Sequence, residues 1–212
     1  MDQEILPFED YKRIFETIYS VLRFVGLEPE KNCTYFSIIG AFLLNEHYGI
    51  NCKSFSGLAA YMLNGDLEAV LAFGECVGEN TCIASINAFH SWVANEDFII
   101  DFQAPLFPEI LSKRIGMSVC DSKMFQKHIS LQCDSLMLFK KSGDFFHAPN
   151  RELTKRIVDD FADNPFNMNI GEICNNWFVN PIHKMKDFVE VTNDYGQMGK
   201  IHICKKSING RW

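Results

Sequence analysis

The sequence lacks several patterns that often reveal a function, and each absence excludes a class of protein. No two of the eight cysteines are spaced as Cys-x-x-Cys, so we expect no zinc ribbon or zinc finger. The chain has no glycine-rich phosphate loop and no apolar run long enough to cross a bilayer. Its 20 basic and 27 acidic residues give a net charge of −7, which offers no general attraction to nucleic acid or to an anionic membrane. We therefore expect no metal and no cofactor, and neither nucleic acid nor membrane among the partners.

The start of the chain and its cysteines together indicate a cytoplasmic protein. The acidic start Met1-Asp2-Gln3-Glu4 is unlike the positively charged start of a signal peptide. An even number of cysteines would allow disulfides, but disulfides belong to oxidising compartments that such a chain is not expected to enter. Most of the cysteines flank apolar residues, as in Thr81-Cys82-Ile83, so we expect them to pack as small apolar side chains.

Length and composition predict a single domain over residues 1–212. An apolar fraction of 47% with 22% charged residues is typical of a folded chain, and 212 residues can bury a substantial core. The spacing of apolar residues predicts three helices, over residues 8–26, 33–48 and 54–64. Strands are predicted next, over residues 67–76, 82–93 and 98–102. Helices followed by antiparallel strands indicate the α+β class, with N-terminal helices packed on an antiparallel β-sheet.

The second half of the chain is interpreted as an α/β extension of the same domain. Its predicted helices cover residues 150–162 and 170–178. Its predicted strands cover residues 135–139 and 200–205. No internal repeat or linker separates this part from the first half.

Residues 89–105 predict a β-hairpin that carries reactive side chains. The run Phe89-His90-Ser91-Trp92-Val93 is followed by the polar break Asn95-Glu96-Asp97 and then by the second apolar run Phe98-Ile99-Ile100-Asp101-Phe102. If the turn centres on Asn95-Glu96, His90 lies opposite Asp101, with the two Cβ atoms about 5 Å apart. A carboxylate at that separation orients an imidazole and stabilises its charged form, as in the His–Asp part of a nucleophilic triad.

Cys33 is the nucleophile that we expect to complete this triad. It follows Asn32, a good N-cap residue, and it begins the predicted helix 33–48. The backbone N–H groups and the dipole at a helix start stabilise a thiolate, and the same groups can contribute to an oxyanion hole. An isolated cysteine more often only packs, and the His–Asp hairpin is what favours a catalytic role here.

Other residues are secondary candidates. Asn32, Trp92 and Gln103 are considered for substrate binding or the oxyanion hole, and Trp92 would equally fit the core. Cys174 lies in a predicted helix and fits a core position better than a catalytic one. His147 lies in a predicted loop without a facing carboxylate, which indicates a surface residue. The remaining histidines have no neighbouring ligand that would favour a metal site: His47, His128, His183 and His202.

The chain resembles the transglutaminase-like branch of the papain-like cysteine enzymes. The resemblance rests on Cys33 opening a helix, on His90-Ser91-Trp92-Val93 in a strand, and on Ile99-Ile100-Asp101-Phe102 in the next strand. It covers residues 30–105, and the sequence is also similar to bacterial families placed near this superfamily. The resemblance implies a papain-like core with Cys33 as nucleophile, His90 as base and Asp101 as the residue that orients it. The branch includes arylamine N-acetyltransferases, whose Arg-Gly-Gly-x-Cys-like motif is replaced here by Lys31-Asn32-Cys33, which disfavours acetyl-CoA chemistry.

We therefore expect an enzyme that acts on an amide or related acyl group, in a peptide or another substrate, through a thioester intermediate. Water as the acceptor would make it a peptidase or amidase, and an amine would make it a transglutaminase-like transferase. The main alternative is a catalytically inactive papain-like fold that binds a peptide or a protein. A third interpretation is a structural protein in which His90 and Asp101 form a satisfied buried pair.

Overall fold

Two helices near the start of the chain lie at the centre of the fold and pack against each other. The computed structural model describes residues 5–77, 81–193 and 195–212, so the acidic start at residues 1–4 lies outside the described part. α1 (Phe8–Phe24) and α2 (Cys33–Tyr48) match the predicted helices closely. Each is followed by a glycine with positive φ, Gly26 at 80° and Gly49 at 65°, a conformation that glycine adopts without strain and that ends a helix.

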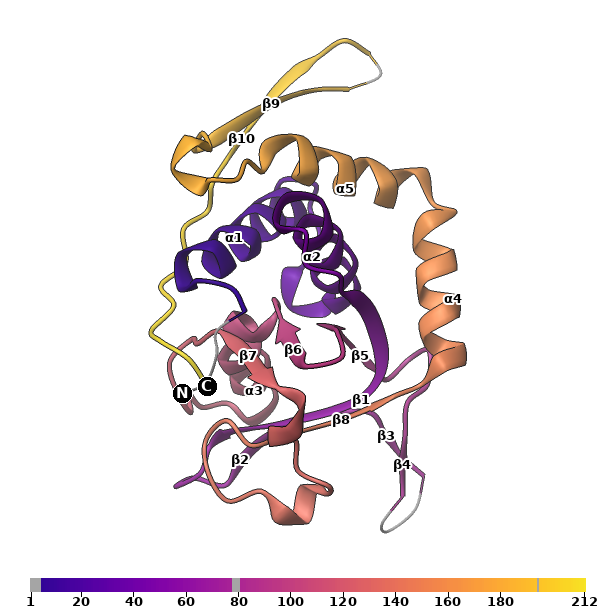
Figure 1. Ribbon diagram of the computed structural model, residues 1–212, viewed down its shortest axis with the longest axis vertical. Helices are drawn as coiled ribbons and strands as arrows, with labels where there is room; N and C mark the ends of the chain where they lie inside the picture. Colours follow the sequence, from indigo (N-terminus) through magenta and orange to yellow (C-terminus); the bar gives the residue numbers. More distant parts are fainter. Residues whose placement is uncertain (1–4, 78–80, 194) are drawn as a thin grey trace.

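The main sheet has six antiparallel strands in the order β2-β1-β5-β6-β7, with β8 also paired to β1 (Figure 1). α2 packs on β5 and β1, and α4 also contacts β1. The chain therefore has the predicted α+β class, with N-terminal helices on an antiparallel sheet. The strands of the main sheet are β1 (Lys53–Asn64), β2 (Ala69–Phe73), β5 (His90–Ala94), β6 (Phe98–Asp101), β7 (Phe125–His128) and β8 (Phe145–Pro149).

The predicted helix 54–64 is wrong, because these residues form most of β1. This strand pairs with β5 along residues 53–57, with β8 along 57–61 and with β2 along 59–64. It is buried along much of its length, so its sequence has no clear alternation and its apolar run resembles a helix. Gly57 lies where β5 and β8 both pair with β1, and a Cβ there would lie 2.2 Å from the carbonyl oxygen of Ala148.

Other elements differ from the prediction where short-range polar bonds or distant partners decide the structure. The predicted strand 135–139 is wrong: Ser135 Oγ accepts a bond from the N–H of Met137 (3.2 Å) and begins a 3-10 turn. The predicted strands 67–76 and 82–93 are each interrupted, and β3 (Glu75–Cys76) and β4 (Cys82–Ile83) form a separate two-stranded sheet. The sequence also did not predict α3 (Phe107–Ile115), β7 or β8.

The C-terminal part wraps around the two central helices (Figure 1). The predicted helices are confirmed as α4 (Arg151–Ala162) and α5 (Pro165–Trp177), and the predicted strand at 200–205 overlaps β10 (Met198–His202), which pairs with β9 (Phe188–Thr192).

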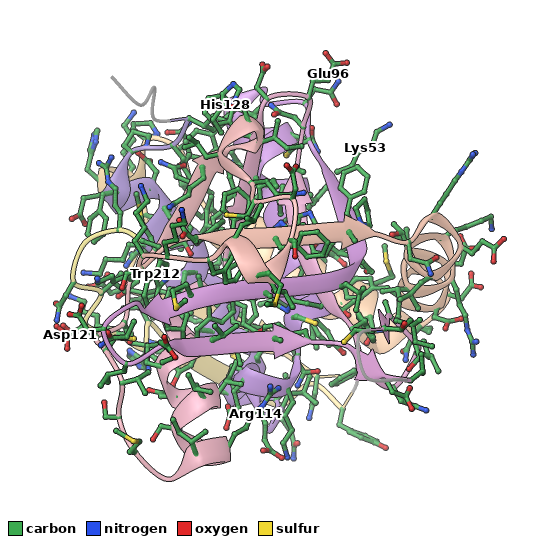
Figure 2. The ribbon with its side chains drawn as sticks, turned by 90° about the horizontal axis from the view of Figure 1, so that it is seen from below. Lys53, Glu96, Arg114, Asp121, His128 and Trp212 are labelled. Atoms are coloured by element: carbon green, nitrogen blue, oxygen red, sulfur yellow. The ribbon has the colours of Figure 1, made fainter. Side chains whose placement is uncertain are left out.

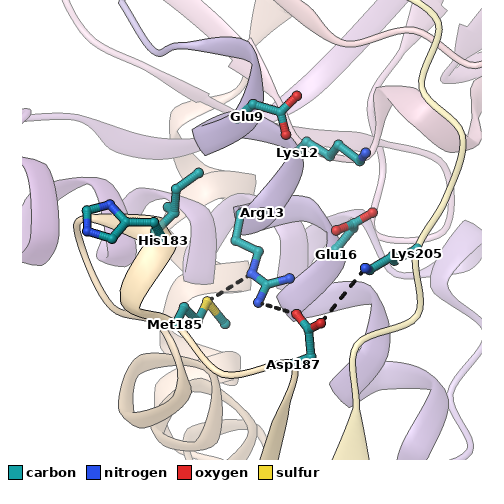
Figure 3. A pocket seen from close by; sticks show the side chains of 9 residues that line it. Glu9, Lys12, Arg13, Glu16, His183, Met185, Asp187 and Lys205 are labelled. Carbon is teal, nitrogen blue, oxygen red and sulfur yellow. Dashed lines mark hydrogen bonds and ion pairs between the residues drawn. The ribbon is translucent and has the colours of Figure 1, made fainter.

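The C-terminal part is attached to α1 through Arg13. The Arg13 guanidinium donates to Asp187 Oδ1 (2.9 Å) and contacts Met185 Sδ (3.1 Å) in a cavity of about 420 Å³ (Figure 3). This cavity mixes acidic and basic side chains, among them Glu9, Lys12 and Lys205. Among the described residues, no helix is both long and apolar enough to cross a membrane.

Candidate functional site

The hairpin that carries His90 and Asp101 forms, but its turn lies one residue further along the chain than predicted. Val93 pairs with Ile100 and Ala94 with Ile99, so the turn centres on Glu96-Asp97. Asn95 causes this shift of the turn. Its side-chain oxygen accepts hydrogen bonds from the N–H groups of Asp97 (3.0 Å) and Phe98 (2.8 Å), which stabilises a turn over the residues that follow Asn95.

His90 and Asp101 are therefore diagonal neighbours and do not lie directly opposite each other. The register differs from the predicted one by two positions, and side chains alternate between sheet faces with a period of two. Both side chains consequently stay on the same face. His90 Nε2 lies 2.6 Å from Asp101 Oδ2, and both side chains are almost completely buried.

Cys33 lies beside the same imidazole at the first residue of α2 and is half-buried. Its thiol forms a side-chain interaction with His90. His90 Nδ1 is buried and accepts or donates no hydrogen bond among the described residues. Since Asp101 occupies Nε2, the unpartnered Nδ1 is the ring atom left to face the thiol. The structure thus brings together the three residues that the sequence singled out.

The charge of His90 is set by its two neighbours. Burial alone would lower the pKa of the imidazole, but the Asp101 carboxylate, and after it the Cys33 thiol, outweigh burial and raise this pKa to about 10. His90 is therefore an imidazolium at neutral pH. A positive charge beside a cysteine favours the thiolate, which is the nucleophilic form of the side chain.

Two further residues extend the site, and sequence analysis missed both. Tyr61 on β1 donates its hydroxyl proton to Asp101 Oδ2 (2.5 Å), and His147 Nε2 on β8 lies 2.7 Å from the same hydroxyl. The carboxylate can only accept, so the Tyr61 proton points to Asp101 and His147 must donate to the Tyr61 oxygen. His147 is 4% exposed, so its predicted surface position is wrong.

Strand alternation explains why these residues meet. His90 pairs with Gly57 and His147 with Ala59, so both histidines share a sheet face with Tyr61, two residues further along β1. The only sequence signal for this cluster is the alternating pattern of β1, and burial of that strand hides it.

The two histidines carry different charges. Burial, and then the charge of His90, hold the pKa of His147 well below its usual range, so this ring is neutral. Burial and the nearby Asp101 carboxylate raise the pKa of Tyr61, which keeps its proton available for donation. The result is a buried chain His147–Tyr61–Asp101–His90 in which only the last two members are charged.

The three secondary candidates, Gln103, Trp92 and Asn32, lie around the Cys33–His90–Asp101 cluster. Gln103 is buried, and its side chain donates to the carbonyl of Pro29 (2.8 Å), in the short turn that leads into α2; its own N–H donates to Asp101 Oδ1 (2.9 Å). Trp92 is 2% exposed and stacks on His147, which is a core position and not a wall of a substrate site. Asn32 precedes α2, but its side chain donates to the carbonyl of Glu28 (2.7 Å) and does not cap the helix.

A cavity of about 530 Å³ opens at Cys33. It is lined by residues 31–34, 72–74 and 86–89 and by Arg114. Phe73 forms part of the wall between the cavity and the imidazole, because its ring stacks on His90 with centroids 4.2 Å apart. A group in this cavity therefore has access to the Cys33 thiol while Asp101, Tyr61 and His147 stay buried beneath it.

The other thiols have different surroundings. Cys52 and Cys174 are buried, as expected of packing residues, and burial raises the pKa of Cys52 to about 12 and that of Cys174 still further. Within the described part of the chain, no cluster of three or more His, Cys, Asp or Glu side chains could hold a metal ion.

Fold and site together define an α+β protein in which a buried, charged His–Asp pair lies beside a cysteine at a helix start. A family model described as Protein of unknown function (DUF2026) matches residues 7–212, so the chain belongs to this family. The fold is similar to that of a crystal structure described as genomics APC5867, with a TM-score of 0.85 and 29% sequence identity. That similarity covers 100% of this chain and 99% of the other. No curated protein shows a significant match to the chain.

Proposed function

We propose that this protein is a cysteine-nucleophile enzyme of papain-like fold that transfers or hydrolyses an acyl group. Cys33 is the nucleophile, His90 the acid and base, and Asp101 the residue that orients and charges His90. The main support is the position of His90, which is fully buried, has a carboxylate on Nε2 and a cysteine beside its ring, and has no hydrogen-bond partner on Nδ1 among the described residues. A structural His–Asp pair would not require a thiol beside the remaining nitrogen, nor a cavity that opens on that thiol.

The chemistry follows from these positions. The Cys33 thiolate attacks the carbonyl carbon, the C–S bond forms, and the carbonyl electron pair moves to oxygen. Collapse of this intermediate breaks the C–N bond, and His90 gives its proton to the departing amine. Water or a second amine then attacks the thioester, His90 takes the proton of the attacking group, and the C–S bond breaks to restore the thiolate.

The backbone at the start of α2 provides the first oxyanion donor. The side chain of Asn32 does not cap this helix and so does not occupy the N–H groups of its first turn. The N–H of Cys33 can therefore donate to the oxygen that becomes negative in the intermediate. Gln103 acts indirectly: it fixes the turn before Cys33 and the carboxylate of Asp101 at the same time.

Labelling with p-nitrophenyl acetate near neutral pH tests this function. We expect rapid release of nitrophenol together with a protein mass increase of one acetyl group, and peptide mapping should locate that group on Cys33. Cys33→Ala should abolish both signals, whereas Cys204→Ala, which removes a thiol of similar exposure that does not line the cavity, should leave them intact.

His90→Gln should slow the acylation by at least about 100-fold, since general acid–base catalysis commonly contributes that much. Undiminished acylation in Cys33→Ala would remove Cys33 from the mechanism. A Cys33 that is inert in the wild-type protein would instead support a catalytically inactive fold that binds a peptide or protein.

A further inference from the structure

The cavity at Cys33 differs in charge from the rest of the chain. The whole protein has a net charge of −7, yet the described residues that line this cavity include Lys31 and Arg114 and neither Asp nor Glu. Lys31 is paired with Glu28 outside the cavity (2.8 Å), which reduces its effect. Arg114 is the cation that remains.

Arg114 is held in place but is not neutralised. One guanidinium nitrogen donates to the carbonyl of Ala72 (3.0 Å), and the group lies over the Phe73 ring, 5.5 Å from its centroid. Among the described residues, no carboxylate forms an ion pair with it. A guanidinium has five N–H donors, so most of its hydrogen-bonding capacity stays available.

Arg114 lines the same cavity as the Cys33 thiol. It lies near the end of α3, at the margin of the molecule opposite Glu96 and the hairpin turn (Figure 2). Phe73 lies between the guanidinium and the imidazole, since the same ring stacks on His90. Both Arg114 and Cys33 line the cavity, so a ligand that fills it can contact both side chains.

We propose, on the basis of the function above, that the acyl substrate carries an anionic group of carboxylate or phosphate type that binds Arg114 while its carbonyl lies at Cys33. Both kinds of anion match the planar fork of a guanidinium. A substrate with a positive charge here would meet the Arg114 guanidinium and, among the described residues that line the cavity, no carboxylate. The volume of about 530 Å³ fits a small-molecule acyl group or the end of a peptide.

Alkylation of Cys33 by two reagents of different charge tests this proposal. Iodoacetate is an anion and iodoacetamide its neutral counterpart, and both form the same kind of C–S bond with release of iodide. The ratio of their rate constants at Cys33, located by peptide mass spectrometry, measures attraction of an anion into the cavity. Arg114→Glu should lower this ratio at least about fivefold, and added salt should lower it in the wild-type protein.

Arg156→Glu is the matched control, because it changes the net charge equally at an exposed position on α4 outside the cavity. It should leave the ratio unchanged. Arg114→Gln removes the charge but keeps a donor for Ala72, and it provides the same comparison if Arg114→Glu does not fold. Protection of Cys33 against iodoacetamide by glutarate or by inorganic phosphate distinguishes the two kinds of anion.

The outcomes separate this proposal from the proposed function. Rapid alkylation by both reagents with the same ratio in Arg114→Glu and Arg156→Glu would overturn the anionic substrate and leave the nucleophile in place. A Cys33 that reacts with neither reagent near neutral pH would overturn the proposed function itself.

Discussion

His90 and His147 lie on one face of the sheet, joined by Tyr61 and Asp101, and only His90 is charged at neutral pH. The difference arises from their partners. His90 contacts a carboxylate, whereas His147 contacts a neutral hydroxyl and is repelled by the charge of His90. Burial would disfavour a charge on either ring, so the carboxylate of Asp101 decides where the proton resides.

The raised pKa of His90 makes stability depend on pH. In the unfolded chain this imidazole titrates near its ordinary value of 6.5, and in the folded protein near 10. The folded state therefore holds a proton that the unfolded state releases, and this stabilisation is complete below pH 6.5 and is lost as the pH rises toward 10. The free energy of unfolding should fall by up to about 1.4 kcal/mol per pH unit in this range. Urea unfolding between pH 6.5 and 9 measures the slope, and His90→Gln should flatten it; equal slopes in both proteins would contradict the assignment.

The contact between Tyr61 and His147 should appear as an energetic coupling. Tyr61→Phe and His147→Phe each remove one partner of the same buried hydrogen bond, and each should cost about 1–3 kcal/mol. Together they should cost less than the sum, with a coupling energy of at least about 0.5 kcal/mol in a double-mutant cycle.

Tyr11 offers the control for that cycle. Its hydroxyl also donates to Asp101, but to the backbone oxygen and not to the carboxylate. Tyr11→Phe and His147→Phe should therefore be additive within about 0.5 kcal/mol. Additivity in both cycles would show that the chain of hydrogen bonds does not act as a unit.

At the scale of elements, β1 is the strand on which the site is built. It carries Tyr61, pairs with the strand of His90 along its first half, and pairs with the strand of His147 further along. These pairings set the spacing between the two histidines before any side chain makes a contact. Gly57 is the residue at which the two pairings meet.

Gly57→Ala should destabilise the protein by about 1–3 kcal/mol, because the added Cβ would collide with the backbone of β8 and force the strands apart. Gly171→Ala is the comparison. Gly171 lies within α5, and its added Cβ would meet only a side-chain atom of Ile39 at 4.0 Å. That change should be neutral or stabilising by up to about 1 kcal/mol, since alanine favours a helix. The midpoints of urea unfolding measure the change in stability of each variant. An equal loss of stability in the two variants would count against the close approach of β8 to Gly57.

At the scale of the whole molecule, the features that could be predicted are those set by nearby residues. α1, α2 and α4 follow from helical spacing and from residues that end or begin a helix, such as Gly49 and Asn150. Cys33, His90 and Asp101 could be selected because two of them lie on one hairpin and the third begins a helix. The class of the fold followed from the order of these elements.

The features that could not be predicted depend on contacts between distant segments. Tyr61 on β1 and His147 on β8 are joined by a side-chain hydrogen bond although they are 86 positions apart in the sequence, and no local pattern in residues 145–149 indicates that partner. The same limitation hid Arg114, which lines the cavity and donates a hydrogen bond to Ala72 near the end of β2, 42 positions earlier in the sequence. The spacing of apolar residues thus predicted a helix at β1, since burial on both faces removes the alternation by which a strand is recognised.

The diagonal contact between His90 and Asp101 has a consequence for insertions and deletions in the hairpin. One residue added between Asn95 and Phe98 would only enlarge the turn, because the pairing of Val93 with Ile100 need not change. One residue added between His90 and Val93 would rotate the imidazole to the other side of the sheet, away from the carboxylate. Length variation among related chains should therefore be tolerated in the turn and excluded from the segment between His90 and Val93.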